Sequence, residues 1–219
     1  VNTERFHGIY EVFGQCISSS VIRHKTPKIC SLCLTENAYC RKIWELAIIT
    51  ACPFHRCLLI SKCSKCGRSV SWNRPEVCQC KCGFDFRQSP VSIVPESEMT
   101  VADRFYSLFG LRTENESEQF PAPLRDLNVE QLASLLFLFV GQHYNTTDTT
   151  GKVVCKKLSN EEMHRRLNEA LRVFSEFPAN FNTFLSNKLK TAEARAGAKR
   201  KYKTSKRRLV FGGFYRAIT

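Results

Sequence analysis

The stretch KICSLCLTENAYCRKIWELAIITACPFHRCLLISKCSKCG, residues 28–67, decides the fold of this chain. It contains seven cysteines and one histidine, and six of these eight residues form pairs at a spacing of three. The pairs are Cys30 with Cys33, Cys52 with His55, and Cys63 with Cys66. A C-x2-C turn holds two thiolates about as far apart as neighbouring corners of a tetrahedron, so two such pairs close one zinc site.

The spacing therefore predicts two structural Zn²⁺ ions. The ligands expected for the first ion are Cys30, Cys33, Cys52 and His55. Four protein ligands leave no coordination position for water, so we expect neither site to be catalytic.

The second site begins with Cys63 and Cys66, and three later cysteines compete for its two remaining positions. Cys80 and Cys82 are preferred because they lie just before Gly83, a residue that readily adopts the left-handed conformation of a tight turn. Cys78 is the alternative ligand.

The remaining cysteines have no partner at metal-ligand spacing. We expect Cys16, Cys40, Cys57 and Cys155 to be small buried apolar residues. Disulfides are not favoured, because the first residues, VNTERFHGIY, lack the pattern of a secretory signal. The longest apolar run, 132–140, is far shorter than the roughly 20 residues that cross a membrane, so we expect no membrane partner.

Positive charge dominates the composition. The chain has 33 Lys and Arg against 20 Asp and Glu, a net charge of +13 and a pI near 9.3. Residues 195–208, RAGAKRKYKTSKRR, hold eight basic residues and no acid. Such a run binds phosphate without reading bases, and we expect its DNA contacts to be Arg195, Lys199, Arg200, Lys201, Lys203, Lys206, Arg207 and Arg208. A solvated tail, a localisation signal or a surface for an acidic or RNA partner are the alternatives.

Helical patterns follow the cysteine-rich part. Thr100 is the expected N-cap of the first helix, Asn128 of a second that ends near Gly141, and Ser159 of a third that Pro178 ends. Ser159 and Glu162 have the spacing of a capping box, and one more helix is expected after Pro178. The predicted fold is thus a small zinc-ribbon or zinc-finger module followed by a mainly α-helical domain that could contain a helix-turn-helix.

The order of residues in the first site resembles the TniQ family, which includes target selectors of bacterial transposons. The matching residues are Cys30, Cys33, Tyr39, Arg41, Trp44, Cys52, Pro53, His55, Leu58, Leu59, Cys63, Cys66, Gly67, Cys82 and Gly83. The resemblance covers about residues 28–86, and the usual start of the family is not recognisable before it. We therefore expect three parts: an N-terminal segment 1–27 that is truncated or divergent, a tandem zinc-finger module 28–88, and a helical domain 98–219 with a basic tail.

The resemblance implies a non-enzymatic, DNA-binding adaptor that selects or marks a target site in transposition, in the cytoplasm of a bacterium. It implies transposition proteins as partners, such as an ATPase regulator and, in some systems, a CRISPR effector complex, and it allows a monomer or a homodimer. The residues themselves agree, because the sequence has no glycine-rich phosphate loop and no acidic pattern for two catalytic metals. The alternative function is a zinc-stabilised interaction module that binds a protein or RNA without recognising DNA.

Overall fold

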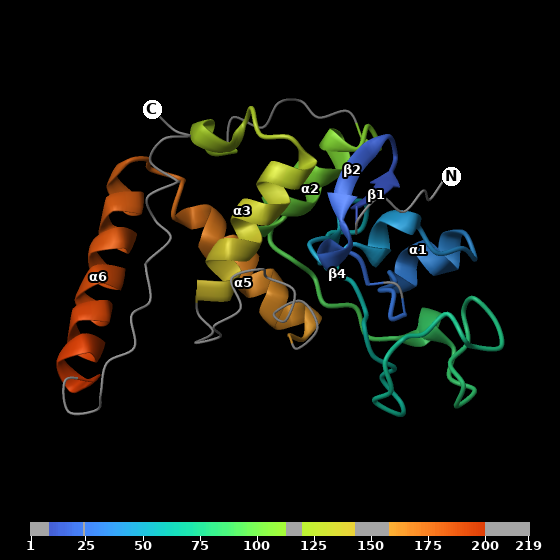
Figure 1. The fold of residues 1–219 in the computed structure, drawn as a ribbon. Helices are drawn as coiled ribbons and strands as arrows, with labels where there is room; N and C mark the ends of the chain where they lie inside the picture. Colours follow the sequence, from blue (N-terminus) through green and yellow to red (C-terminus); the bar gives the residue numbers. More distant parts are fainter. Residues whose placement is uncertain (1–8, 24, 113–119, 143–157, 200–219) are drawn as a thin grey trace. The chain divides into compact units, whose positions relative to one another are not determined.

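A computed structural model describes residues 9–23, 25–112, 120–142 and 158–199 (Figure 1). The chain divides into two compact units, residues 1–177 and residues 178–219. The first unit contains both groups of paired cysteines and most of the helices, and the second contains the last described helix.

The first unit begins with a short antiparallel hairpin. Strands β1 (Ile9–Val12) and β2 (Gln15–Ser18) pair with Val12 opposite Gln15, so Phe13 and Gly14 make the turn. Both turn residues have positive φ, 50° and 74°, as a tight two-residue hairpin turn requires. Cys16 lies in β2 and is exposed, so the expectation that it is buried was wrong. The reason is the strand period of two, which turns Ile17 inward and its neighbour outward.

Residues 28–60 fold around a compact apolar core. Helix α1 (Ser31–Glu36), the 3-10 helix η2 (Lys42–Glu45) and the two-stranded sheet of β3 (Ala51–Cys52) and β4 (Cys57–Leu58) surround it. The buried residues of this core are Ile29, Leu34, Ile43, Trp44, Leu46, Ile48, Ile49 and Leu59. This part has an apolar core of its own, because residues 45–50, ELAIIT, are all buried.

Residues 61–88 are built mainly of turns. In this segment the buried apolar side chains other than cysteine are Val70 and Phe86, the latter at the start of the 3-10 helix η3 (Phe86–Gln88). Arg74 holds the loops together, because its guanidinium donates hydrogen bonds to the carbonyls of Ser71, Glu76 and Val77 and to Cys40 Sγ. Because the apolar core of this segment is so small, a metal ion bound by its cysteines must supply much of its stability.

The helical part contains α2 (Thr100–Leu108), α3 (Val129–Gln142) and α5 (Asn160–Arg172), with short 3-10 helices η4 (Glu96–Glu98) and η5 (Ala122–Leu124). Helices α3 and α5 pack against each other, and Phe174, just after α5, has its ring centroid 5.0 Å from that of Phe139 in α3. The prediction of a helical region after the cysteine clusters is confirmed.

The helix ends agree with the sequence patterns in part. Asn128 caps α3 through a hydrogen bond from Gln131 N, and Ser159 caps α5 through one from Glu162 N. Thr100 is not an N-cap. Met99 takes that position, and Thr100 donates its hydroxyl to the carbonyl of Ser97. Helix α3 ends at Gln142, one residue from the expected stop at Gly141, and α5 ends at Arg172, before Pro178.

Helix α5 is attached to the cysteine-rich core through its buried first turn. Asn160, 1% exposed, donates hydrogen bonds of 2.7 and 2.8 Å to the carbonyls of Thr50 and Leu59. His164, one turn later, lies 2.9 Å from Thr50 Oγ1 through Nδ1. These contacts fix the strand that carries Cys52 relative to the helices.

The second unit contains helix α6 (Ala179–Lys199), where the sequence predicts one more helix. Phe181, Phe184, Leu185 and Lys188 recur at helical spacing and are half-buried. The helix-turn-helix and the boundaries of the three expected parts stay predictions.

Candidate metal centres

The first cluster forms where helix α1 meets the β3–β4 hairpin. Cys30 is the N-cap of α1 and Cys33 lies in its first turn, so both sulfurs emerge at the same end of the helix. Cys52 ends β3, and His55 lies in the hairpin loop, where Arg56 adopts a positive φ of 45°. The hairpin register, with Cys52 opposite Cys57, turns the loop back over the helix N-terminus.

The donor atoms of this cluster have the spacing of a tetrahedron. Cys33 Sγ lies 3.6 Å from Cys52 Sγ, and His55 Nδ1 lies 3.6, 3.3 and 3.7 Å from the sulfurs of Cys30, Cys33 and Cys52. Metal–sulfur bonds of about 2.3 Å give a tetrahedral edge of about 3.8 Å. The four residues can therefore hold one metal ion with no open position.

Glu36 orients the histidine of the first cluster. Because Nδ1 faces the three sulfurs, Nε2 carries the ring proton and donates it to Glu36 Oε1 at 2.9 Å. Such a carboxylate fixes the tautomer of a metal-binding histidine and makes its free nitrogen more basic. Sequence reasoning missed this residue. Its position three residues after Cys33, at the end of α1, was the only hint.

Two further side chains lie against the first cluster. Cys57 Sγ is buried and 3.6 Å from Cys30 Sγ, so the prediction that Cys57 is buried is confirmed. Arg41 stacks on two exposed rings, with its guanidinium carbon 4.7 Å from the centroid of Phe54 and 5.4 Å from that of Tyr39. These rings and the guanidinium cover one side of the site.

The second cluster is formed by two similar knuckles (turns that each present two cysteines). In the first, Cys63 N donates to the carbonyl of Arg68 at 2.8 Å, and Gly67 turns the chain with φ 69°. In the second, Cys80 N donates to the carbonyl of Phe84 at 2.8 Å, and Gly83 turns the chain with φ 83°. A side chain would strain both glycine positions.

The two knuckles bring four sulfurs together. Cys63 Sγ lies 3.7 Å from Cys82 Sγ, and Cys66 Sγ lies 3.7 Å from Cys80 Sγ. These distances again match a tetrahedral edge of about 3.8 Å. Cys78 is buried and lies outside this group, and its carbonyl accepts a hydrogen bond from Phe86 N. The structure thus gathers Cys80 and Cys82, and not Cys78, with the first knuckle.

The thiols of the second cluster have unequal acidity in the protein without metal. Arg68 Nε donates to Cys66 Sγ at 3.4 Å, and this hydrogen bond lowers the pKa of Cys66 to about 6. Burial raises the pKa of Cys80 to about 11. Metal binding must therefore displace a proton from Cys80 near neutral pH, whereas Cys66 is already largely ionised.

The predicted DNA contacts lie at and beyond the end of the described chain. Arg195 and Lys199 lie in the last two turns of α6. Arg200, Lys201, Lys203, Lys206, Arg207 and Arg208 lie outside the described residues, as does Cys155.

The fold and the two clusters define a class of protein. It is a protein in which two clusters of cysteine and histidine ligands, each able to hold a metal ion, precede a helical region. Residues 1–59 match the model of the TniQ family, so the chain is similar to that family over this segment, and the resemblance is confirmed there.

The match corrects the extent that we expected for the resemblance. It begins at residue 1, so it includes the stretch before Cys30 in which no family start was recognisable, and it ends at residue 59, before the second cluster. The family that this segment matches has functions related to transposition. No curated protein matches the chain. None of the described helices combines the length and apolar character needed to cross a membrane.

Proposed function

We propose that this protein is a non-catalytic, DNA-binding adaptor of transposition that selects or marks a target site and recruits other transposition proteins. The observation that carries the proposal is that the family match over residues 1–59 contains the complete first cluster, from Cys30 to His55. The part of the chain that matches the family model therefore carries one complete set of four metal-ligand candidates.

Both clusters are proposed to hold Zn²⁺ as a structural ion. Three thiolates with one imidazole, and four thiolates, are donor sets typical of structural zinc. Each set is complete, so a bound ion has no position for a water or a substrate. The proposed role of the metal is to position the surfaces of residues 28–88, which supports an adaptor rather than an enzyme.

DNA is proposed as the polyanionic partner. The net charge of +13 supports this choice, as does the basic run 195–208 at the end of helix α6. Contacts of this kind position a protein on the duplex, and sequence reading needs further side chains at base edges. The proposed protein partners are an ATPase regulator of the transposon or a CRISPR effector complex, and the proposed location is the bacterial cytoplasm.

A salt series tests the DNA-binding proposal. Affinity for a double-stranded DNA is measured between about 50 and 200 mM salt, for the whole chain and for a version that ends at Glu193. We expect the DNA affinity of the whole chain to fall steeply as salt rises. The slope of log affinity against log salt should be smaller for the shorter version, because a protein that makes fewer phosphate contacts releases fewer counterions on binding. No binding by the whole chain at the lowest salt would contradict the proposal. It would favour the alternative, a zinc-stabilised module that binds a protein or RNA partner.

A further inference from the structure

The two clusters differ in the residues that their ligand loops present. The residues between the paired ligands of the first cluster are Ser31 and Leu32, and Pro53 and Phe54, and none of them is charged. In the second cluster, one lysine lies between the cysteines of each knuckle, Lys65 in the first and Lys81 in the second. We call these two residues the knuckle lysines.

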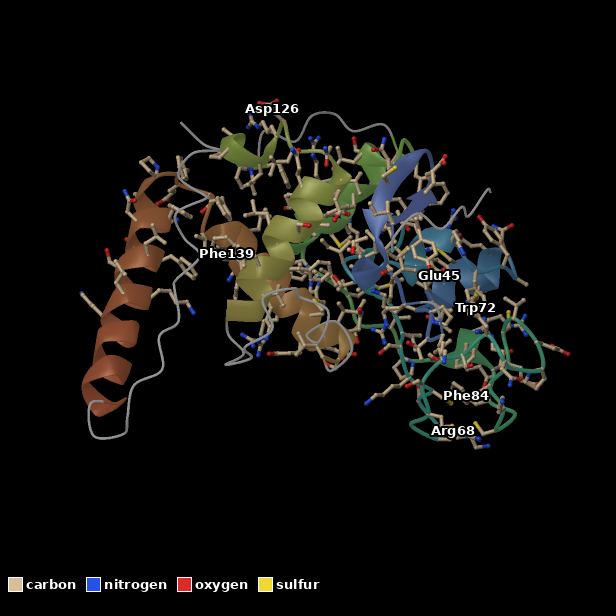
Figure 2. All side chains as sticks on the ribbon, in the orientation of Figure 1. Glu45, Arg68, Trp72, Phe84, Asp126 and Phe139 are labelled. Carbon is tan, nitrogen blue, oxygen red and sulfur yellow. The ribbon has the colours of Figure 1, made fainter. Side chains whose placement is uncertain are left out.

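The geometry of the second cluster places the knuckle lysines on two turns that meet at one group of four sulfurs. Lys65 adjoins Cys66, and Lys81 adjoins Cys80, and the sulfurs of these two cysteines are 3.7 Å apart. Both lysines are exposed. Figure 2 shows Arg68, the next basic residue of the first knuckle, near one end of this segment and Trp72 toward the other.

The knuckle lysines are free to bind a ligand, whereas the arginines of this segment are engaged. Arg68 donates to Cys66 Sγ, Arg74 to three carbonyls and to Cys40, and Arg87 to Asp85 at 2.6 Å. Within the part of the chain that the structure describes, neither Lys65 nor Lys81 has a hydrogen-bond or ion-pair partner for its ammonium group.

Acidic residues do little to cancel this charge. Residues 61–88 contain six Lys and Arg and two acids, Glu76 and Asp85. Asp85 is paired with Arg87, which holds the pKa of its carboxyl below the usual value. Arg68 already hydrogen-bonds a thiolate of the cluster, so the two lysines are not needed for that contact.

We propose that the two knuckles of the second cluster form a phosphate-binding end, in which Lys65 and Lys81 contact the backbone of double-stranded DNA. This inference rests on the proposed DNA-binding function and adds a contact site outside the basic tail and outside the segment that matches the family. The metal would hold the two lysines in a fixed pair, and lysine contacts of this kind position the protein without reading sequence.

The experiment measures DNA affinity against salt for the whole chain and for Lys65→Gln, Lys81→Gln and the double variant. Each lost phosphate contact reduces the slope of log affinity against log salt by about 0.9, so we expect a loss of about 0.9 for each single variant and about 1.8 for the double variant. Lys65→Arg keeps the charge and is expected to keep the slope. Lys25→Gln removes an exposed lysine that lies far along the chain from this cluster and serves as the matched control.

Metal retention is measured beside DNA binding, by native mass spectrometry in the presence of a competing chelator. We expect all variants to keep the metal of the second cluster. An unchanged slope in the double variant, while the whole chain still binds DNA, would overturn this inference and leave the proposed function intact. The inference is also overturned if the lysine variants lose metal with no change in slope, because the lysines then serve only to balance the charge of the thiolates. No binding by the whole chain contradicts the proposed function itself.

Discussion

The imidazole of His164 in helix α5 lies 2.9 Å, through Nδ1, from the hydroxyl of Thr50, two residues before the metal-ligand candidate Cys52. Its other nitrogen, Nε2, lies 3.3 Å from Glu98, which also pairs with Arg172 at 3.6 Å. This histidine connects three parts of the first unit, the β3 strand region, the 3-10 helix η4 and helix α5. Its charge state therefore affects how firmly the helices hold the cysteine-rich core.

The stability of the first unit is expected to fall as the pH drops below about 6.5, in part through His164. Burial lowers the pKa of His164, and the nearby Glu98 carboxylate only partly opposes this. The unfolded chain thus binds more protons than the folded chain between the two pKa values, so stability is present above the unfolded pKa and is lost as the pH falls toward the folded pKa. Urea unfolding at pH 7.5 and pH 5.5 measures the loss.

The control is His164→Gln, which has no titrating ring. Acid also protonates metal ligands in both proteins, so the informative quantity is the difference between them. The wild-type protein should lose more stability than His164→Gln over this pH range. Equal losses would show that His164 does not titrate in the folding reaction.

Asn160→Ala is expected to destabilise the first unit by about 1–3 kcal/mol for each carbonyl left without a donor. The side chain of Asn160 satisfies the buried carbonyls of Thr50 and Leu59, and alanine leaves no group in reach of either. Denaturant unfolding measures the change. Asn73→Ala removes the same side chain from an exposed loop and should change stability by less than about 0.5 kcal/mol. A similar effect of both substitutions would contradict the role assigned to Asn160.

Removal of metal is expected to unfold residues 61–88 while residues 29–60 stay compact. The first part has a core of buried residues that includes Trp44 and Ile48, whereas the second relies on Val70 and Phe86 beside the cysteines. Hydrogen exchange before and after treatment with a strong chelator distinguishes the two segments. Protection that survives unchanged in 61–88 would show that metal does not hold this segment.

The sequence predicts the clusters well because their geometry depends on local spacing. Pairs such as Cys63 with Cys66, followed by Gly67, close a turn whose shape depends on a few consecutive residues. The choice of Cys80 and Cys82 over Cys78 also followed from a local feature, their position just before Gly83, and Gly83 has the positive φ of such a turn in the structure.

Contacts between distant segments are not visible in such patterns. Glu36 is one acidic residue among twenty acids until the hairpin loop brings His55 to it. His164 reads as an isolated histidine until α5 packs on Thr50. The apolar residues of 46–51 have no clear period, so the sequence does not distinguish a helix from a strand there, and the structure buries all of them beside the first cluster.

Glu36→Gln is expected to weaken metal binding at the first cluster by roughly tenfold to a hundredfold. Glutamine keeps a hydrogen-bond acceptor of the same size but removes the negative charge that makes the coordinating nitrogen of His55 more basic. Competition with a chelator, followed by native mass spectrometry, measures the affinity. Glu76→Gln, in the segment 61–88 that carries the second cluster, is the matched control and should leave metal binding at the first cluster unchanged. Equal affinities in Glu36→Gln and the wild-type protein would mean that Glu36 does not support the site.

The second cluster is expected to bind metal through Cys80 and not through Cys78. Cys80→Ser should lower the metal count from two ions to one per chain, because Cys80 Sγ lies 3.7 Å from Cys66 Sγ within a complete set of four donors. Cys78→Ser should leave two ions, because Cys78 is buried outside this set. Native mass spectrometry of the two variants, prepared in parallel, counts the ions. If Cys78→Ser loses an ion and Cys80→Ser keeps both, the second knuckle binds metal through Cys78 in place of Cys80, and the ligand set assigned to the second cluster is wrong.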